Sequence, residues 1–270
     1  MNKRRARFDW FVVSFALVGS LLLLFIVVPL LTTLIGTPAD ALWQAITDAD
    51  VQASVALTFY AAAWATILAM LTGVPLAYVL ARNNFTGKRW VEGIINLPIV
   101  VPHTAAGIAL LMVFGRQAPL GQAFSILGLK FTDGVPGIVV AMLFVSLPYL
   151  VNAARQAFAL INPELERVAQ VEGASRWQAF IYVTLPLAWR GIMAGAVMMW
   201  GRGISEFGAV VILAYNPKII PVLVYEYFAG FGLTAALPLT VILILASLAV
   251  FVLLQILFVP DKEAIAITEE

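Results

Sequence analysis

The sequence predicts an all-α integral membrane protein with six transmembrane helices. Of its 270 residues, 62% are hydrophobic and 11% are charged, whereas soluble domains carry about 25% charged residues. The mean hydropathy is +0.98, and a soluble fold of this length has too little polar surface to cover so many apolar side chains. The apolar residues also form long charge-free stretches, which is typical of helices that cross a bilayer.

Five charge-free stretches are long enough to cross about 30 Å of hydrocarbon, which takes roughly 20 apolar residues. They cover residues 10–39, 51–81, 93–115, 134–154 and 227–260. A sixth stretch, 191–217, is equally apolar except for Arg202 and Glu206. We therefore expect spans at about 10–35, 54–81, 93–114, 135–160, 191–214 and 235–259. The first follows a basic start, as a signal peptide does, but its apolar run exceeds the usual length of about 7–15 residues, so we expect a retained helix.

The distribution of Lys and Arg predicts the orientation of these spans, because short basic loops stay on the cytoplasmic side. With the N-terminus inside, twelve of the sixteen basic residues fall in inner segments and three fall in outer loops, Arg116, Lys130 and Lys218. We therefore expect both termini in the cytoplasm and a single membrane domain over residues 1–270.

The segment 161–186, between the fourth and fifth spans, carries too many charges to enter hydrocarbon at low cost. Asn162, Pro163 and Glu164 favour a helix start, with a side-chain acceptor, a proline and an acid in the first turn. Gly173 is expected to end that helix, and a second short helix over 175–183 is expected before the chain re-enters the membrane at 185–186. From the pattern alone, an amphipathic loop lying on the membrane surface is an equal alternative.

Other features of the composition exclude several classes of function. The net charge of +1 gives no basic face for nucleic acid. The chain has no cysteine and one histidine, His103, so thiolate and multi-histidine metal sites are excluded. It also lacks the glycine-rich loop with Lys-Ser/Thr that binds nucleotide phosphates, so it is expected not to be an enzyme that hydrolyses ATP by itself.

The fifth span contains two charges that a membrane helix does not hold without a reason. Arg202 and Glu206 are four residues apart and share a helix face with Ser205, and a central Arg costs about 2.5–3.5 kcal/mol on insertion scales. One interpretation is an ion pair that fixes packing; the other is a guanidinium that binds a passing oxyanion while Glu206 organises it. His103 and Thr104, near the start of the third span, are candidates for the same path, although a lone histidine there is more often a local hydrogen-bonding group.

The cytoplasmic segment resembles the "EAA" loop of ATP-binding-cassette (ABC) importer permeases, in which Glu-Ala-Ala, three residues, Gly, nine residues and Ile-x-Leu-Pro recur. Here the spacing is intact, and Ala169, Gly173, Leu185 and Pro186 match. The departures are Arg167 in place of the glutamate, Val168 in place of the first alanine and Val183 in place of isoleucine. Residues 72–78, 97–107 and 201–209 are similar to segments of molybdate/tungstate permeases, with sulfate permeases second.

This resemblance implies a permease subunit that forms the translocation path for molybdate and tungstate in the plasma membrane of a prokaryote, surrounded by lipid. It implies a second copy of the chain, two ATPase subunits that bind ATP and Mg²⁺, and an extracytoplasmic oxyanion-binding protein. It also implies that a short helix within 161–186 couples the permease to the ATPase, through Glu164, Leu165, Glu166, Arg167, Ala169, Gly173, Ala174 and Ser175.

Three alternatives remain at this point. A sulfate/thiosulfate permease of the same family differs only in its anion. An ion-driven secondary carrier typically has more intramembrane carboxylates and an internal repeat. A membrane-embedded hydrolase needs clustered His, Asp or Glu within the spans, where only His103 and Glu206 occur.

Overall fold

The computed structural model describes residues 10–258, and the regular secondary structure in this range is entirely helical. The elements in chain order are α1 (Trp10–Ile35), α2 (Ala39–Thr47), α3 (Ala49–Arg82), α4 (Lys88–Val100), α5 (His103–Phe114), α6 (Pro119–Ile126), α7 (Val135–Leu160), α8 (Glu164–Val171), α9 (Arg176–Ala179), the π-helical turn η1 (Phe180–Thr184), α10 (Leu185–Ile204), α11 (Gly208–Leu213), α12 (Ile220–Phe231) and α13 (Leu233–Phe258). The basic start of the chain and Lys262, which contribute to the orientation argument, lie outside the described residues.

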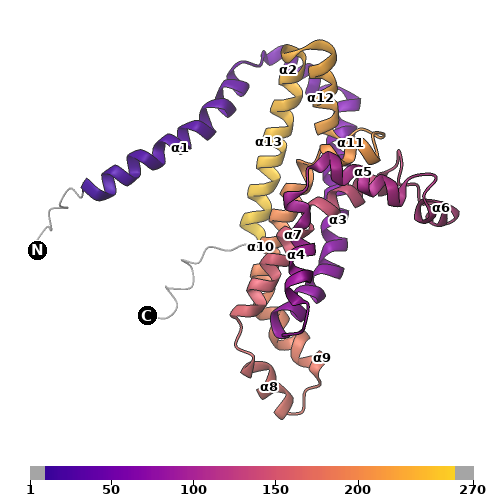
Figure 1. Ribbon diagram of the computed structural model, residues 1–270. Coiled ribbons are helices and arrows are strands. Elements are labelled where there is room, and N and C mark those ends of the chain that lie inside the picture. The colour runs from indigo at the N-terminus through magenta and orange to yellow at the C-terminus, as the bar shows by residue number, and fades with distance from the viewer. Residues whose placement is uncertain (1–9, 259–270) are drawn as a thin grey trace, which may run out of the picture.

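Helices α3, α7 and α10 form the core of the bundle (Figure 1). The buried face of α3 is rich in alanine, and Ala61, Ala65 and Ala69 are each at most 1% exposed. Their spacing of four places them in one row along the helix. Small side chains in that row let the neighbouring helices approach closely, which is the usual way for membrane helices to gain packing energy where the hydrophobic effect gives none.

Glycines on α10 let the backbone of this helix pack closely against α7. A Cβ atom on Gly195 would lie 2.6 Å from the Cβ of Ala153, and one on Gly191 would lie 2.5 Å from the Cβ of Ala157. The two glycines are four residues apart, so both face the same partner. The small-residue spacing in the sequence therefore marks a helix contact.

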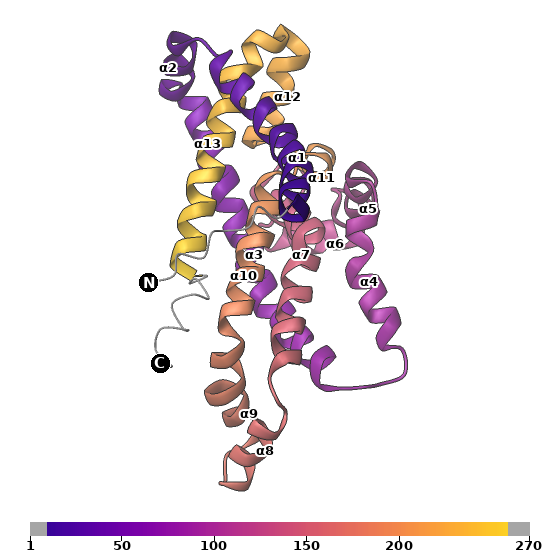
Figure 2. The ribbon, with the colours of Figure 1, turned by 90° about the vertical axis from the view of Figure 1, so that its left-hand side faces the viewer.

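The region of the expected span at 93–114 consists of two helices, α4 and α5, and the chain bends by 115° between them. The break lies at Val101 and Pro102. Proline has no N–H to donate and disfavours a helical conformation in the residue before it, and Val101 is accordingly extended, with φ −70° and ψ 132°. Figure 2 shows α4 rising toward the bend and α5 turning away from its direction.

The expected span at 191–214 also requires correction at both ends. Residues Arg176–Ile204 form one continuous apolar helix of 29 residues. The short helix expected at 175–183 is therefore the first part of this helix, which continues without a break through Pro186. The π-helical turn η1 precedes Pro186 and shifts the hydrogen-bond register where proline cannot donate. At the other end, α10 stops at Ile204, and residues 208–213 form the separate helix α11.

The remaining long helices lie at the periphery. Helix α1 extends away from the bundle (Figure 1), and none of its 26 residues is buried. Helix α13 lies along α10 and α12, while α2 and α12 cap the end of the bundle opposite α8 (Figures 1 and 2). Within residues 10–258, five helices are long and apolar enough to cross a membrane, and the bent pair α4 and α5 makes a sixth if it counts as one span.

The α7–α10 contact gives a stability prediction. We expect Gly195→Ala to lower the free energy of unfolding by about 1–3 kcal/mol, because the new methyl group overlaps Ala153 and both helices must separate. The matched control is Gly93→Ala in α4, where a Cβ meets nothing within 4 Å and helix propensity favours alanine. The measurement is the thermal unfolding midpoint in detergent. Equal midpoints for the two variants would contradict the close contact.

Candidate functional site

The break between α4 and α5 places His103 at the first position of α5. A second break faces it, because α10 ends at Ile204 and α11 begins at Gly208. The intervening Glu206 accepts the backbone N–H of Ala209 on its Oε1 at 2.8 Å, which satisfies a donor at the start of α11. Two interrupted helices therefore meet at their breaks.

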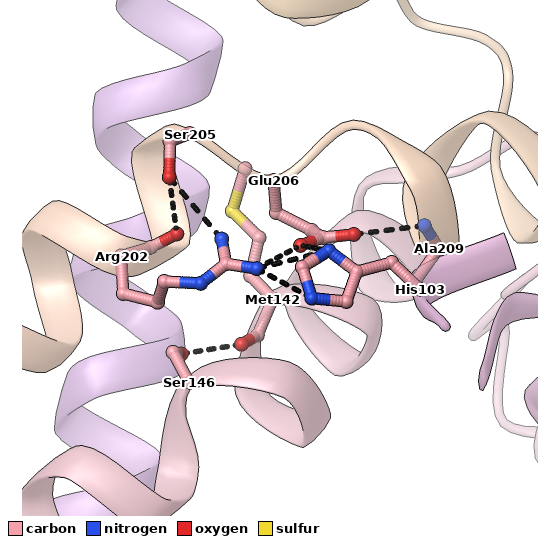
Figure 3. A network of polar contacts seen from close by, with 7 residues as sticks. All are labelled: His103, Met142, Ser146, Arg202, Ser205, Glu206 and Ala209. Atoms are coloured by element: carbon pink, nitrogen blue, oxygen red, sulfur yellow. Dashed lines mark hydrogen bonds and ion pairs between the residues drawn. The ribbon is translucent and has the colours of Figure 1, made fainter. Parts of the chain in front are cut away.

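The two breaks are held together by a polar network (Figure 3). The Nη2 atom of Arg202 lies 3.1 Å from Glu206 Oε2 and 2.8 Å from His103 Nε2. His103 Nδ1 lies 3.1 Å from the same carboxylate oxygen. The Nη1 atom of Arg202 donates to Ser205 Oγ at 3.1 Å. The ion pair between Arg202 and Glu206 that the sequence suggested is thus present, and His103, from a distant part of the chain, contacts both residues.

Burial differs sharply among these groups. The Glu206 side chain is 0% exposed, that of Arg202 is 19% exposed and that of His103 is 38% exposed. A fully buried carboxylate needs a matched charge and hydrogen bonds, which Arg202 and Ala209 supply. Thr104, the next residue after His103, is exposed, and among the described residues no hydrogen bond joins its side chain to the network.

Arg202 also borders an open groove of about 480 Å³ between α7, α10 and α13. The other walls are mainly apolar and include Tyr149, Met198 and Phe251. Arg202 therefore lines a groove and its side chain is partly exposed, whereas the Glu206 side chain is fully buried. The arrangement can bind an anion through Arg202 without exposing the carboxylate that balances it.

Glycines hold α5 and α11 together around this network. A Cβ atom on Gly107 would lie 2.9 Å from the carbonyl oxygen of Ala209, and one on Gly208 would lie 2.8 Å from the Cβ of His103. The two short helices therefore pack backbone against backbone, which fixes His103 relative to Glu206.

A second set of polar contacts, which the sequence did not suggest, joins α4 to α7. Asn152 Nδ2 donates to Asn96 Oδ1 at 2.6 Å, and Arg155 Nη1 lies 3.2 Å from Glu92 Oε1. Arg155 lies within α7, in the expected span at 135–160. The partners come from separate stretches of sequence, so no local spacing could reveal the pairing.

The segment after α7 folds as the helix start and stop signals predict. Helix α8 begins at Glu164 and is followed by Gly173, whose φ of +97° is a left-handed conformation suited to glycine. The N–H of Ala174 donates to Ala169 O and that of Gly173 donates to Gln170 O, which is a Schellman motif. Ser175 then caps α9 reciprocally with Gln178.

Glu166 differs from the other coupling candidates, because it is the only buried residue of α8. Its Oε1 accepts hydrogen bonds at 2.8 Å from Arg82 Nε and Thr184 Oγ1, and its Oε2 accepts one at 2.8 Å from Tyr78 OH. Burial raises the pKa of the Glu166 carboxyl, but hydrogen bonds from Thr184, Tyr78 and Arg82 outweigh it and hold that pKa below the ordinary glutamate value.

Most of the other residues of α8 and α9 face outward, although Ala179 is buried and Ala169 is half-buried. Leu165, Val168 and Val171 are 46%, 59% and 85% exposed, and Trp177 is 69% exposed. Arg167 forms an exposed ion pair with Glu164. This exposed apolar surface at the end of the bundle is typical of a protein contact.

Comparison with known proteins decides the family. Residues 73–259 match the family described as binding-protein-dependent transport system inner membrane component. The chain belongs to this family. It is a multi-pass permease of the plasma membrane in a transport system that depends on a binding protein, and ATP hydrolysis belongs to separate subunits of such systems, so the chain is not itself an enzyme. Among the described residues, no group of three or more His, Cys, Asp or Glu is placed to hold a metal ion.

Several relatives of this permease are similar along most of their length. It is 42% identical over 251 residues to a molybdate/tungstate transport system permease protein of Thermococcus kodakarensis, covering 92% of this chain and 96% of that protein. Identity to the corresponding protein of Pyrococcus furiosus is 44% over 251 residues, with the same coverage. A probable sulfate transport system permease protein of Chlorokybus atmophyticus is 33% identical over 221 residues, which are 80% of this chain and 77% of that protein.

A solved structure shares the fold of the permease. It is a chain of a bacterial alginate ABC transporter in complex with an alginate pentasaccharide-bound periplasmic protein, with a TM-score of 0.73 at 17% identity. The likeness covers 92% of this chain and 93% of that one.

The Glu166 contacts give a pH prediction for the permease. Because the pKa of Glu166 is lowered in the folded state, its contribution to holding α8 is present above the usual glutamate pKa of about 4.3 and is lost as pH falls through the lower folded value. A nitroxide on Val168→Cys in this cysteine-free chain should therefore gain mobility only below about pH 4.3.

Two control variants identify the titrating group. Glu166→Gln should abolish the mobility transition, whereas Glu164→Gln, which changes an exposed acid of the same helix, should leave it in place. A midpoint above the usual glutamate pKa would contradict the lowered value.

Proposed function

We propose that this chain is the permease subunit of an ABC importer for molybdate and tungstate. The observation that carries the proposal is the Arg202 network, in which a partly accessible guanidinium stands where two interrupted helices meet. Similarity to molybdate/tungstate permeases over 92% of the chain supports the choice of anion, and identity to the sulfate permease is lower over a shorter part of the chain.

The working complex in this proposal contains two copies of the chain, two ATPase subunits and an oxyanion-binding protein. ATP and Mg²⁺ bind on the ATPase subunits, since this sequence has no phosphate-binding loop. The end of the bundle that carries α8 and α9 faces the cytoplasm with both chain termini, in agreement with the excess of basic residues in the inner segments. Lipid and the second copy cover the exposed apolar helices, including α1.

The proposed ATPase contact is the exposed face of α8 and α9. Leu165, Val168 and Trp177 supply apolar surface, and Arg167 with Glu164 forms a charged rim. Ala169, Gly173, Ala174 and Ser175 shape the turn between the two helices. Because Arg167 already pairs with Glu164 in this chain, its docking role is a contribution to the rim and not a replacement for the glutamate of the family pattern.

The proposed translocation path passes Arg202, with His103, Thr104 and Ser205 beside it. Arginine offers planar donors to two oxygens of a tetrahedral oxyanion. An uncompensated arginine in a low-dielectric path would hold the anion too tightly for release. Glu206 offsets part of that charge from a fully buried position, so binding remains weak enough for transport.

The first prediction tests the proposed substrate. In proteoliposomes containing the assembled complex, we expect molybdate or tungstate to stimulate ATP hydrolysis at lower concentration than sulfate does. The control is the same complex without its binding protein, which should lose the stimulation. Stimulation by sulfate alone would select the sulfate permease, and uptake that follows an ion gradient without ATP would select a secondary carrier.

The second prediction separates the path from packing. We expect Arg202→Met and Glu206→Gln each to cost about 3–5 kcal/mol of stability, because each leaves a buried partner uncompensated. The double variant should recover most of that stability, since neither charge remains. Anion uptake should nevertheless stay at least tenfold below that of the parent. Full recovery of uptake in the double variant would remove Arg202 from the path.

A further inference from the structure

Helices α8 and α9 stand at one end of the bundle, away from its core (Figures 1 and 2). Seven of the eight residues of α8 are not buried, and Glu166 alone reaches inward. Whatever holds α8 in a defined place on the bundle must therefore act largely through this carboxylate.

Arg82, the last residue of α3, is the main partner of Glu166. Its Nε donates to Glu166 Oε1 at 2.8 Å, and its Nη2 lies 2.8 Å from the same oxygen. Its Nη1 donates to the carbonyl oxygens of Phe158 at 2.9 Å and Ile161 at 3.0 Å, at the end of α7. One guanidinium therefore binds α8 and the end of α7 together, and both charged side chains are at most 12% exposed.

Two further groups complete this cluster, which we name the Arg82 clamp: Arg82, Glu166, Tyr78 and Thr184. Tyr78 lies one turn before Arg82 on α3 and donates to Glu166 Oε2. Thr184 donates to Oε1 from the end of η1, directly before α10. The Tyr78 ring packs edge-on against the Phe180 ring, with 4.8 Å between the ring centroids. The clamp thus joins α8 to three helices of the core.

Helix α3 extends from the clamp to the opposite end of the bundle. It is one uninterrupted helix of 34 residues, which corresponds to about 50 Å. Near its other end, Thr58 Oγ1 accepts the backbone N–H of Ile220 at 2.9 Å, at the start of α12. Helix α3 therefore connects Arg82 to the far side of the membrane domain without a break, with Pro75 inside it.

We propose that Arg82 and Glu166 are positioning residues that transmit movement of α8 to α3 and α7, and that they do not contact the ATPase themselves. The inference rests on the proposed coupling function of α8 and α9. Removing the clamp should leave the exposed docking face intact and disconnect it from the core. Hydrolysis then continues, whereas transport does not.

The test uses the whole complex in proteoliposomes, with molybdate as the transported probe. The variants are Arg82→Met and Glu166→Gln, which remove one charge each at similar volume. We expect ATPase assembly to be retained, ATP hydrolysis to stay within about twofold of the parent and molybdate imported per ATP hydrolysed to fall at least tenfold. The matched control is Arg116→Met, which breaks the exposed Arg116–Asp133 ion pair and should leave this ratio unchanged.

A spectroscopic measurement separates transmission from simple structural support. Environment-sensitive labels on single cysteines at Gln170, an exposed position of α8, and Ala53 at the far end of α3 should both respond to ATP in the parent complex. In Glu166→Gln, the α8 label should still respond and the α3 label should not. This readout also applies if Arg82→Met fails to assemble.

Specific outcomes overturn the proposal. Parent-like transport per ATP in both variants would show that the clamp transmits nothing. Loss of assembly in Glu166→Gln, with hydrolysis and uptake falling together, would make the clamp a support for docking only. A parent chain that neither assembles with an ATPase nor imports molybdate would instead remove the proposed function, and the role of the clamp with it.

Discussion

A carboxylate buried in an apolar bundle must be paired, and two such carboxylates determine much of this structure. Glu206 lies at the breaks in two helices, and Glu166 lies at the end of the bundle. Glu206 is held by Arg202 one turn earlier, by the Ala209 N–H and by His103 from α5. Glu166 is held by Arg82 of α3 and by the hydroxyl groups of Tyr78 and Thr184. Because an unpaired buried charge costs several kcal/mol, each cluster fixes the relative position of the elements that contribute to it.

The long helices could be predicted from the sequence because their signal is local. Helices α1 and α7 cover the ranges expected from charge-free stretches, since hydropathy over about 20 residues reflects a requirement that each segment meets by itself. The start and end of α8 were likewise readable from Asn162, Pro163 and Gly173, whose effects extend over a single turn.

The helix breaks could not be predicted, because proline alone does not decide them. Pro29, Pro75, Pro148 and Pro238 all lie inside continuous helices, whereas Pro102 ends one. What differs at Pro102 is tertiary: α5 turns to pack on α11 through glycines and brings His103 to Glu206. The Arg82 clamp was missed for a similar reason, since Arg82 and Glu166 are 84 residues apart.

The contact between α5 and α11 restricts how this region of the protein can vary. Gly107 and Gly208 touch the opposing backbone, so no side chain is present that could shrink or rotate to accommodate a larger neighbour. Any substitution there acts on both short helices at once, and with them on His103 and Glu206. In the proposed translocation path, gradual change is therefore open to Thr104 and to the groove beside Arg202, whereas a side chain at either glycine displaces both short helices.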